Sequence, residues 1–340
     1  MMCCAPPVRT RTGRSCANGE PGHGYRMDLR SLNADRIAVF GDLSGHLAPL
    51  ISELAALGVR FDRSGVPRAI THWPDDLAVV QVGDLVHKGP DSEVIVAVVH
   101  DLLIPSGRWI QLVGNHESQY LPPGRHFWSP KIDPTLAGAL VNLWDRGDMV
   151  AAAAIETHDG RDMLATHAGL TVQSHDLLTR ELGQAPSAAQ VVAALRDPRR
   201  QRLVFAAGTM LGMRDDPGVI WAEARSELHV PWVQRAFYNQ APSFDQVHGH
   251  SAPIIRVYRR GFKVPDDLAE FTARQPSSGH WRTLLPSPHK DDDGSLSDGA
   301  AADALAADGI AATITAIDPG ANERRVVAPK PLMLKGTVRW

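Results

Sequence analysis

The 340-residue sequence contains only three cysteines, and all of them lie within its first sixteen residues. The rest of the chain therefore forms no disulfide framework, which is typical of a reducing compartment. The Pro/Arg/Gly-rich opening shows no hydrophobic periodicity, so we predict a disordered leader over residues 1–33, with a Cys/His cluster that includes His23 as the alternative. Met27 is an alternative start of translation.

Long apolar runs are also missing. No stretch approaches the roughly 20 consecutive apolar residues that span a bilayer, and the N-terminus lacks the apolar segment of a secretory signal. Charges of both signs are interspersed, with a formal net charge of -3, so no dense basic surface is available for nucleic acid or for an anionic membrane. We therefore expect a cytoplasmic protein with neither of these partners, in which a metal or a few arginines hold any phosphorylated ligand.

Five short segments share one design, an apolar and mostly β-branched run that ends in Gly, Asp, Asn or His. They are RIAVFGD (36–42), LAVVQVGD (77–84), WIQLVGNHE (109–117), DMLATHAG (162–169) and FDQVHGHS (244–251). Continuous runs of this length predict strands that are buried on both faces. Their polar residues would then lie at the carboxyl ends of the strands.

Helical periodicity separates these runs, at 47–58, 90–103, 134–147 and 187–197. Alternation of strands and helices predicts a layered α/β fold, as one domain over residues 34–340. An acidic, Ala/Ser/Gly-rich stretch at about 284–308 is typical of a low-complexity insertion. The segment after it alternates like strands around an Asp-Pro-Gly turn, so we expect the C-terminus to return to the sheet.

Ligands of such sheets bind in the crevice beyond the carboxyl ends of the strands. The polar residues predicted to converge there are Asp42, Asp84, Asn115, His116, His167, His248 and His250. Carboxylate, amide oxygen and imidazole together suit Mn, Fe or Zn. A site with two metals needs a bridging carboxylate, and Asp84 is the natural bridge. His116 is placed to stabilise charge or to protonate a leaving oxygen.

The ordered motifs GD-x-x-GH, GDLVHKGPDS, GNHE, HAGL and GHS resemble those of the calcineurin-like metallophosphoesterases. The resemblance is greatest to the phosphoprotein-phosphatase and bacterial diadenosine tetraphosphatase-like branch, and it covers about residues 36–258, with AIDPGA (316–321) similar to the closing strand of the family. It implies a four-layer fold in which two central mixed sheets are flanked by helices. It also implies a hydrolase in which a metal-activated water cleaves phosphate ester or nucleotide pyrophosphate bonds. The substrate would be a phosphorylated small molecule, a nucleotide or a phosphoprotein.

The resemblance further implies a role for each motif residue and two divalent metal ions. Asp42 and Asp84 would hold the first metal, and His116 would be the catalytic histidine. The second metal would be held by Asp84, Asn115, His167 and His250.

Three residues depart from the family pattern. Ser44 stands where a histidine normally completes the first metal site, so we predict a weak first site in which Ser44 holds water. Ligation by His46 is the alternative, although its position at the start of the next helix favours another direction for its side chain. His87 replaces an acid that orients the catalytic histidine, so His87 is a candidate for contact with His116 or with the substrate. Lys88 replaces a phosphate-binding arginine and is a further candidate for substrate contact. The alternative function is therefore a degenerate regulatory protein that binds phosphate or metal with weak or no catalysis.

Two further residues are candidates for contact with substrate. His248 and His250 are two residues apart, which on a strand places both side chains on one face; His248 would then touch substrate or fill space. Arg225 is a candidate phosphate contact, with a solvated side chain as the alternative.

Overall fold

A computed structural model describes residues 29–63, 65–257, 261–287, 309–317 and 330–340 of the chain. The three cysteines, His23, Met27, most of the low-complexity stretch and the Asp-Pro-Gly turn lie outside the described residues. Strand β1 (Ser31–Phe40) begins within the range predicted as leader. Its first residues pair with the C-terminal strand but are mostly exposed or half-buried, so they carry no apolar run that would have revealed the strand.

All five strands expected from the apolar runs are present. They are β1, β4 (Leu77–Gln81), β5 (Trp109–Leu112), β8 (Asp162–Thr166) and β9 (Asp245–His248). β1, β4 and β5 are parallel neighbours, and β8 and β9 are a second parallel pair. The carboxyl ends within each group therefore share one edge of the sheet, as predicted.

The expected two central sheets are joined into one mixed sheet of eleven strands, in the order β12-β13-β14-β9-β8-β7-β15-β1-β4-β5-β6. β15 (Leu332–Arg339) makes the join, because it pairs antiparallel with β1 on one side and with β7 on the other. The remaining strands of this sheet are β6 (Met149–Val150), β7 (Ala152–Thr157), β12 (Thr272–Arg274), β13 (Trp281–Pro286) and β14 (Ile310–Ala316). Separate hairpins pair β2 (Arg60–Phe61) with β3 (Ile70–His72), and β10 (Ile255–Val257) with β11 (Gly261–Lys263).

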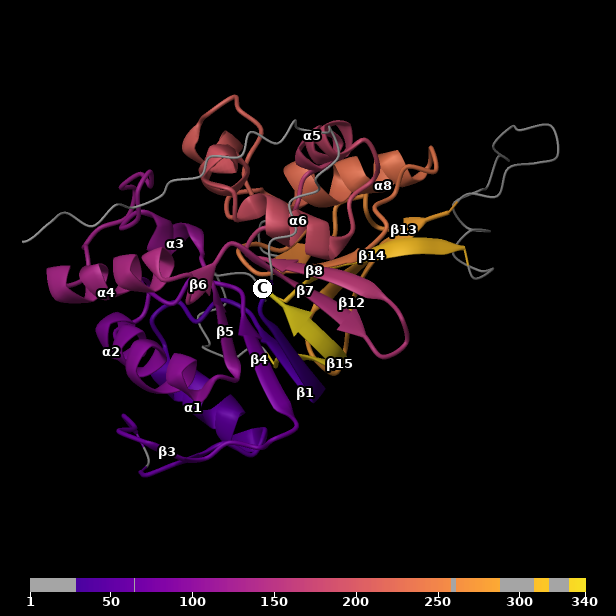
Figure 1. The fold of residues 1–340 in the computed structure, drawn as a ribbon. Coiled ribbons are helices and arrows are strands. Elements are labelled where there is room, and N and C mark those ends of the chain that lie inside the picture. The colour runs from indigo at the N-terminus through magenta and orange to yellow at the C-terminus, as the bar shows by residue number, and fades with distance from the viewer. Residues whose placement is uncertain (1–28, 64, 258–260, 288–308, 318–329) are drawn as a thin grey trace, which may run out of the picture.

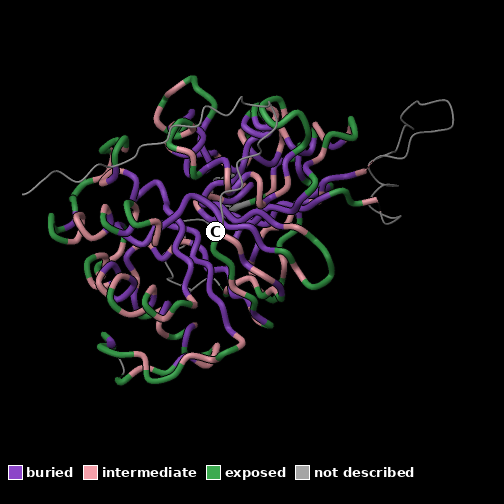
Figure 2. Tube along the Cα trace, in the orientation of Figure 1, coloured by how far each residue is buried: buried purple, intermediate pink, exposed green. Residues whose placement is uncertain are grey.

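The two halves of the sheet pack face to face. Ile37, Val80 and Ile110 from one half lie in the same buried cluster as Ile155 and Val247 from the other. The opposite faces of β1 and β4 belong to a second cluster that includes residues of the covering helices. Figure 2 shows the strands as the most buried part of the chain. Burial on both faces explains why these strands read as uninterrupted apolar runs.

Helices cover the outer faces of both halves (Figure 1). One group is α1 (Leu47–Ala56), α2 (Ser92–Val98, continued by a π-helical turn over Val99–Leu103), α3 (Asn115–Ser118) and α4 (Pro134–Asp145). The other is α5 (Val172–Leu182), α6 (Ala188–Leu195), α7 (Arg202–Phe205) and α8 (Val230–Ala236). The four predicted helices are thus confirmed. Among the described residues, no helix is both long and apolar enough to cross a membrane.

Candidate metal centre

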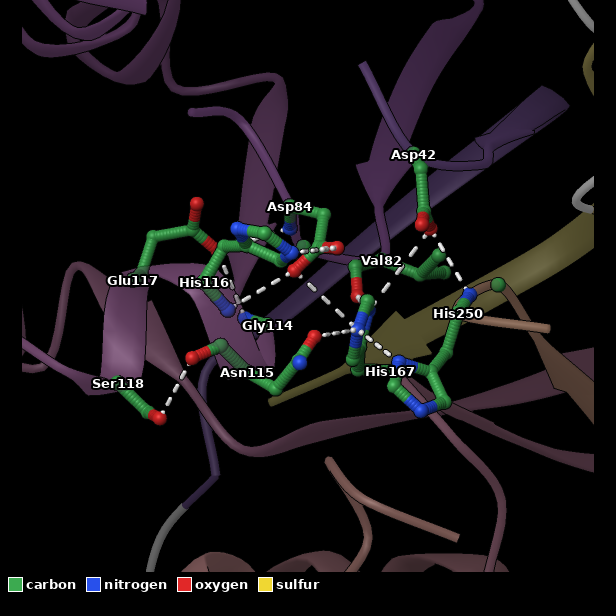
Figure 3. Close-up of polar contacts among 12 residues, drawn as sticks. Asp42, Val82, Asp84, Gly114, Asn115, His116, Glu117, Ser118, His167 and His250 are labelled. Atoms are coloured by element: carbon green, nitrogen blue, oxygen red, sulfur yellow. Dashed lines mark hydrogen bonds and ion pairs between the residues drawn. The ribbon is translucent and has the colours of Figure 1, made fainter. Parts of the chain in front are cut away.

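Three side chains from three strand ends meet at one point. Nitrogen and carboxylate oxygen atoms of Asp84, His167 and His250 lie within 4.8 Å of one another. Asp84 follows β4, His167 follows β8, and His250 follows β9. Figure 3 shows the three side chains pointing toward each other, with Asn115 beside them. The two halves of the sheet therefore contribute jointly to the centre, as the convergence of strand ends predicted.

The Nε2 atom of His167 is the centre of this group. It lies 3.0 Å from Oδ1 of Asn115, 3.3 Å from Oδ1 of Asp84 and 3.2 Å from Nδ1 of His250. The other ring nitrogen, Nδ1, lies 3.0 Å from the carbonyl oxygen of Val82. A carbonyl accepts only, so Nδ1 carries the proton and Nε2 presents a lone pair. This arrangement is the one by which proteins orient histidine ligands of metals.

The donor set fits a divalent cation. Three of the atoms that converge, His167 Nε2, Asn115 Oδ1 and Asp84 Oδ1, are acceptors that cannot satisfy one another. The second carboxylate oxygen of Asp84 is buried and accepts no hydrogen bond from the described residues. A cation at this point would satisfy all of these lone pairs, with imidazole, amide and carboxylate ligands of the kind that Mn, Fe and Zn accept.

Burial sets the charges of the ligands. Desolvation lowers the pKa of His167 and His250, so both rings are neutral at pH 7 and can bind a metal. Burial by itself would raise the pKa of Asp84, but the adjacent histidines, His167 first, outweigh it and hold that pKa below its usual range. The centre thus presents one carboxylate charge and neutral imidazoles.

The loops that carry the site have an uncommon backbone. Six residues other than glycine have positive φ angles in the described part of the chain, and five of them belong to these loops: Ser44 (47°), Asp84 (57°), His87 (72°), Lys88 (63°) and His250 (63°). The left-handed region costs free energy for such residues and is concentrated at functional sites. Backbone N–H groups of Leu43 and Ser44 both donate to the carbonyl oxygen of Asp84, at 3.0 and 2.7 Å, which joins the first two loops.

Glu117 is a supporting residue that the sequence reasoning did not assign. Its buried carboxylate accepts backbone N–H groups of Asp84 (2.8 Å), Leu85 (2.7 Å), Val86 (3.2 Å) and Gly114 (2.9 Å). Burial and then the Asp84 charge raise the pKa of Glu117, whereas these N–H groups act in the opposite direction. A glutamate three residues after the helix N-cap is a capping-box signal, and Gly114 to Glu117 has that spacing.

Asp42 points toward His167 and His250 (Figure 3). Its Oδ1 accepts the backbone N–H of His250 at 2.9 Å and is 3.9 Å from Nδ1 of His167. This approach requires Gly249, because a Cβ atom there would collide with Oδ1 of Asp42. Nδ1 of His46 lies beside Gly89, where a Cβ atom would meet it at 2.7 Å, and His46 is not part of the group of Asp84, His167 and His250. The residues predicted for the first metal are thus linked through the backbone, since Asp42 contacts His250 and the N–H group of Ser44 donates to the carbonyl oxygen of Asp84.

His116 lies at the edge of the centre. Its Nε2 is 3.8 Å from Oδ2 of Asp84, and Nζ of Lys88 is 3.7 Å from the same oxygen. Its Nδ1 is 2.6 Å from Nδ1 of His87, so the predicted contact of His87 with His116 is present. Burial lowers the pKa of both rings to about 4.

The structure does not support two predicted substrate contacts. His248 is fully buried, with Nε2 2.9 Å from Nε2 of His229 and Nδ1 2.9 Å from the carbonyl oxygen of Gly249. It does not share a face with His250, because β9 ends at His248 and His250 has a positive φ angle. Arg225 instead forms an ion pair of 2.8 Å with Asp267.

Comparison with known proteins identifies a family. A family model described as calcineurin-like phosphoesterase matches residues 35–260. Similar solved structures include a cold-active protein-tyrosine phosphatase of a psychrophilic Shewanella species, 15% identical, with 78% of this chain and 80% of that chain covered and a TM-score of 0.37. They also include a metallophosphoesterase from Sphaerobacter thermophilus (14%, 90% and 87%, TM-score 0.34) and a protein serine/threonine phosphatase from Saccharomyces cerevisiae (13%, 87% and 82%, TM-score 0.34). No curated protein matches the sequence.

Proposed function

The chain belongs to the calcineurin-like phosphoesterases, hydrolases that act on phosphoester bonds, and on this premise we propose that it hydrolyses phosphate esters at a divalent metal. The residues that would hold the metal are Asp84, Asn115, His167 and His250; we refer to them as the quartet. The observation that carries the proposal is the convergence on His167 Nε2 of Oδ1 of Asn115 and Oδ1 of Asp84, three acceptor atoms that cannot donate to one another. A bound cation polarises a phosphoryl oxygen and lowers the pKa of a water molecule.

Other side chains would act on the substrate itself. His116 presents Nε2 beside Asp84, where a ring nitrogen can stabilise charge on a leaving oxygen. Lys88 offers one ammonium group at 3.7 Å from the same carboxylate and retains partial exposure, so it can attract a phosphate as a point charge.

A second, weaker metal position would lie between Asp84 and Asp42. Ser44 lies on the same loop as Asp42, and a hydroxyl is a poorer ligand than imidazole for Mn, Fe or Zn. In this proposal Ser44 holds a water molecule. We refer to Asp42 and Ser44 together as the corner.

The substrate is proposed as a phosphorylated small molecule, a nucleotide or a phosphoprotein. A panel of phosphomonoesters, dinucleoside polyphosphates and phosphopeptides would distinguish these three classes.

Metal binding and turnover test the proposal together. The purified chain would be stripped with a chelator and titrated with Mn²⁺, and hydrolysis of p-nitrophenyl phosphate would be followed during the titration. We expect one tightly bound ion, a second weaker one, and turnover that depends on added metal. Asp84→Asn should lose both properties, whereas Asp75→Asn, which changes a fully exposed acid, should retain both. Absence of turnover with every divalent metal, with unchanged metal content in Asp84→Asn, would reject the proposal.

A further inference from the structure

The ring of His87 is inserted between His116 and Tyr120. Its Nδ1 lies 2.6 Å from Nδ1 of His116, and its Nε2 lies 2.7 Å from the hydroxyl oxygen of Tyr120. His87 is 5% exposed, so these contacts are not exchanged for water. A hydrogen bond between two imidazoles needs one donor and one acceptor. The groups on the far side of His87 therefore decide which ring donates.

Tyr120 donates to His87. The hydroxyl oxygen of Tyr120 accepts the backbone N–H of Ile132 at 3.1 Å, and its own proton points at Nε2 of His87 because the amide of Gln119 directs a second donor at the same ring nitrogen. That nitrogen therefore acts as an acceptor.

Gln119 supports the same assignment. Its Oε1 accepts the backbone N–H groups of Trp128 at 3.0 Å and of Phe127 at 3.3 Å. The amide nitrogen of Gln119 then faces Nε2 of His87, at 3.3 Å. Two donors, a hydroxyl and an amide, thus point at one ring nitrogen, which cannot itself carry a proton.

The proton of neutral His87 is therefore on Nδ1, and Nδ1 donates to Nδ1 of His116. Neutral His116 must then carry its proton on Nε2, the atom that lies 3.8 Å from Oδ2 of Asp84. We propose that His87 is a positioning residue that fixes this tautomer of His116, so that an N–H group and not a lone pair faces the leaving oxygen of the substrate. This inference rests on the proposed function, because it assigns the state of its catalytic histidine.

The residue type at position 87 determines the outcome. A carboxylate at this position can only accept a hydrogen bond, so it would select the opposite neutral tautomer, with the proton of His116 on Nδ1. His87 reverses that direction. The hydrogen bond from Nε2 would stabilise the negative charge that develops on the leaving oxygen, an effect worth about 10²–10³ in kcat when one such donor is removed.

A matched pair of variants tests the direction of the bond. His87→Asn places an amide donor, and His87→Asp a carboxylate acceptor, near the position of Nδ1, and both residue types tolerate the left-handed backbone of position 87. The full chain would be labelled with ¹⁵N-histidine, and the signals of His116 would be assigned by their loss in His116→Gln. In the wild type and in His87→Asn we expect a protonated Nε2 and an unprotonated Nδ1, both in the metal-free and in the Zn²⁺-loaded protein. In His87→Asp we expect a protonated Nδ1.

Kinetics supply the second readout. His87→Ala should lower kcat for phenyl phosphate about tenfold more than kcat for p-nitrophenyl phosphate, because the poorer leaving group depends more on a hydrogen-bond donor. His87→Asn should retain the wild-type ratio of the two substrates. A protonated Nδ1 of His116 in the wild type, or equal losses with both substrates in His87→Ala, would overturn the inference. If no substrate turns over, the proposed function fails, while the ¹⁵N spectra still decide the tautomer.

Discussion

The quartet and the corner meet at Asp84, yet they differ in the ligands that they offer. In the quartet, two imidazoles, an amide and a carboxylate come together from separate strand ends. In the corner as proposed, the side chains added to Asp84 would be the carboxylate of Asp42 and the hydroxyl of Ser44. The backbone of the corner is nevertheless joined to Asp84 by hydrogen bonds, since N–H groups of Leu43 and Ser44 both donate to the carbonyl oxygen of Asp84. The corner therefore differs from the quartet in the ligand atoms that its side chains offer, although hydrogen bonds fix its backbone too.

The largest effect is expected from removal of the central ligand of the quartet. His167→Gln takes away the lone pair of Nε2 on which the other ligands converge, and it should lower turnover by about a thousandfold or more. Binding of Mn²⁺, followed by calorimetry, should lose its tight phase. His158→Gln is the matched control, because it changes an exposed histidine. Tight binding that survives in His167→Gln would place the strong site at the corner and break the comparison.

Glu117→Gln is expected to weaken both regions at once. The carboxylate of Glu117 accepts four backbone N–H groups, including that of the shared ligand Asp84. An amide offers one acceptor oxygen and turns an NH₂ group toward the remaining donors, so about 3 kcal/mol of unfolding free energy should be lost.

Denaturant unfolding would measure this loss, and metal titration would show weaker binding in both phases. Glu93→Gln is the control, because Glu93 is exposed and accepts one N–H group at 3.3 Å. A loss of affinity confined to one phase would show that Glu117 does not act through Asp84.

The sequence was sufficient to predict those parts of the molecule that depend on local patterns. Strands buried on both faces have apolar runs that end abruptly, so the positions of Asp84, His167 and His250 at strand ends could be predicted, and so could their convergence. The resemblance of the motifs to those of the metallophosphoesterases added the expectation that these residues bind metal. The four helices predicted at 47–58, 90–103, 134–147 and 187–197 followed from the helical spacing of apolar residues in the same way.

The features that escaped prediction depend on residues distant in sequence or on single backbone angles. β15 joins the two halves of the sheet, and no local pattern indicates which strands it pairs with. The direction of His248 depends on where β9 ends and on the φ angle of His250. The role of Glu117 depends on N–H groups of residues 84–86, about thirty positions away. Alternation and motif spacing carry no information about these contacts.

Ser44→His would sharpen the comparison by supplying the missing imidazole. The φ angle of Ser44 is 47°, and this chain already holds His87 and His250 at similar angles, so the backbone can accept a histidine. We expect the weak phase of Mn²⁺ binding to become about tenfold tighter or more, with the tight phase unchanged. Ser44→Asn, which adds an amide but no imidazole, is the control. Unchanged metal affinity in Ser44→His would contradict the assignment of the corner as a metal position.

The smallest effect is expected behind the quartet, where a buried chain of hydrogen bonds runs from Thr283 through His229 and His248 to the carbonyl oxygen of Gly249. The carbonyl oxygen of Gly249 accepts a hydrogen bond from Nδ1 of His248, so Nε2 of His248 accepts one from Nε2 of His229. Nδ1 of His229 then accepts a hydrogen bond from the hydroxyl of Thr283. Thr283→Val keeps the shape but leaves Nδ1 of His229 without its donor, which should cost about 1–2 kcal/mol of unfolding free energy. Metal affinity should fall by less than about threefold, because the chain ends one residue before the ligand His250. Thr315→Val on the neighbouring strand is the control. Equal unfolding free energies of the two variants would show that this chain of hydrogen bonds does not stabilise the fold.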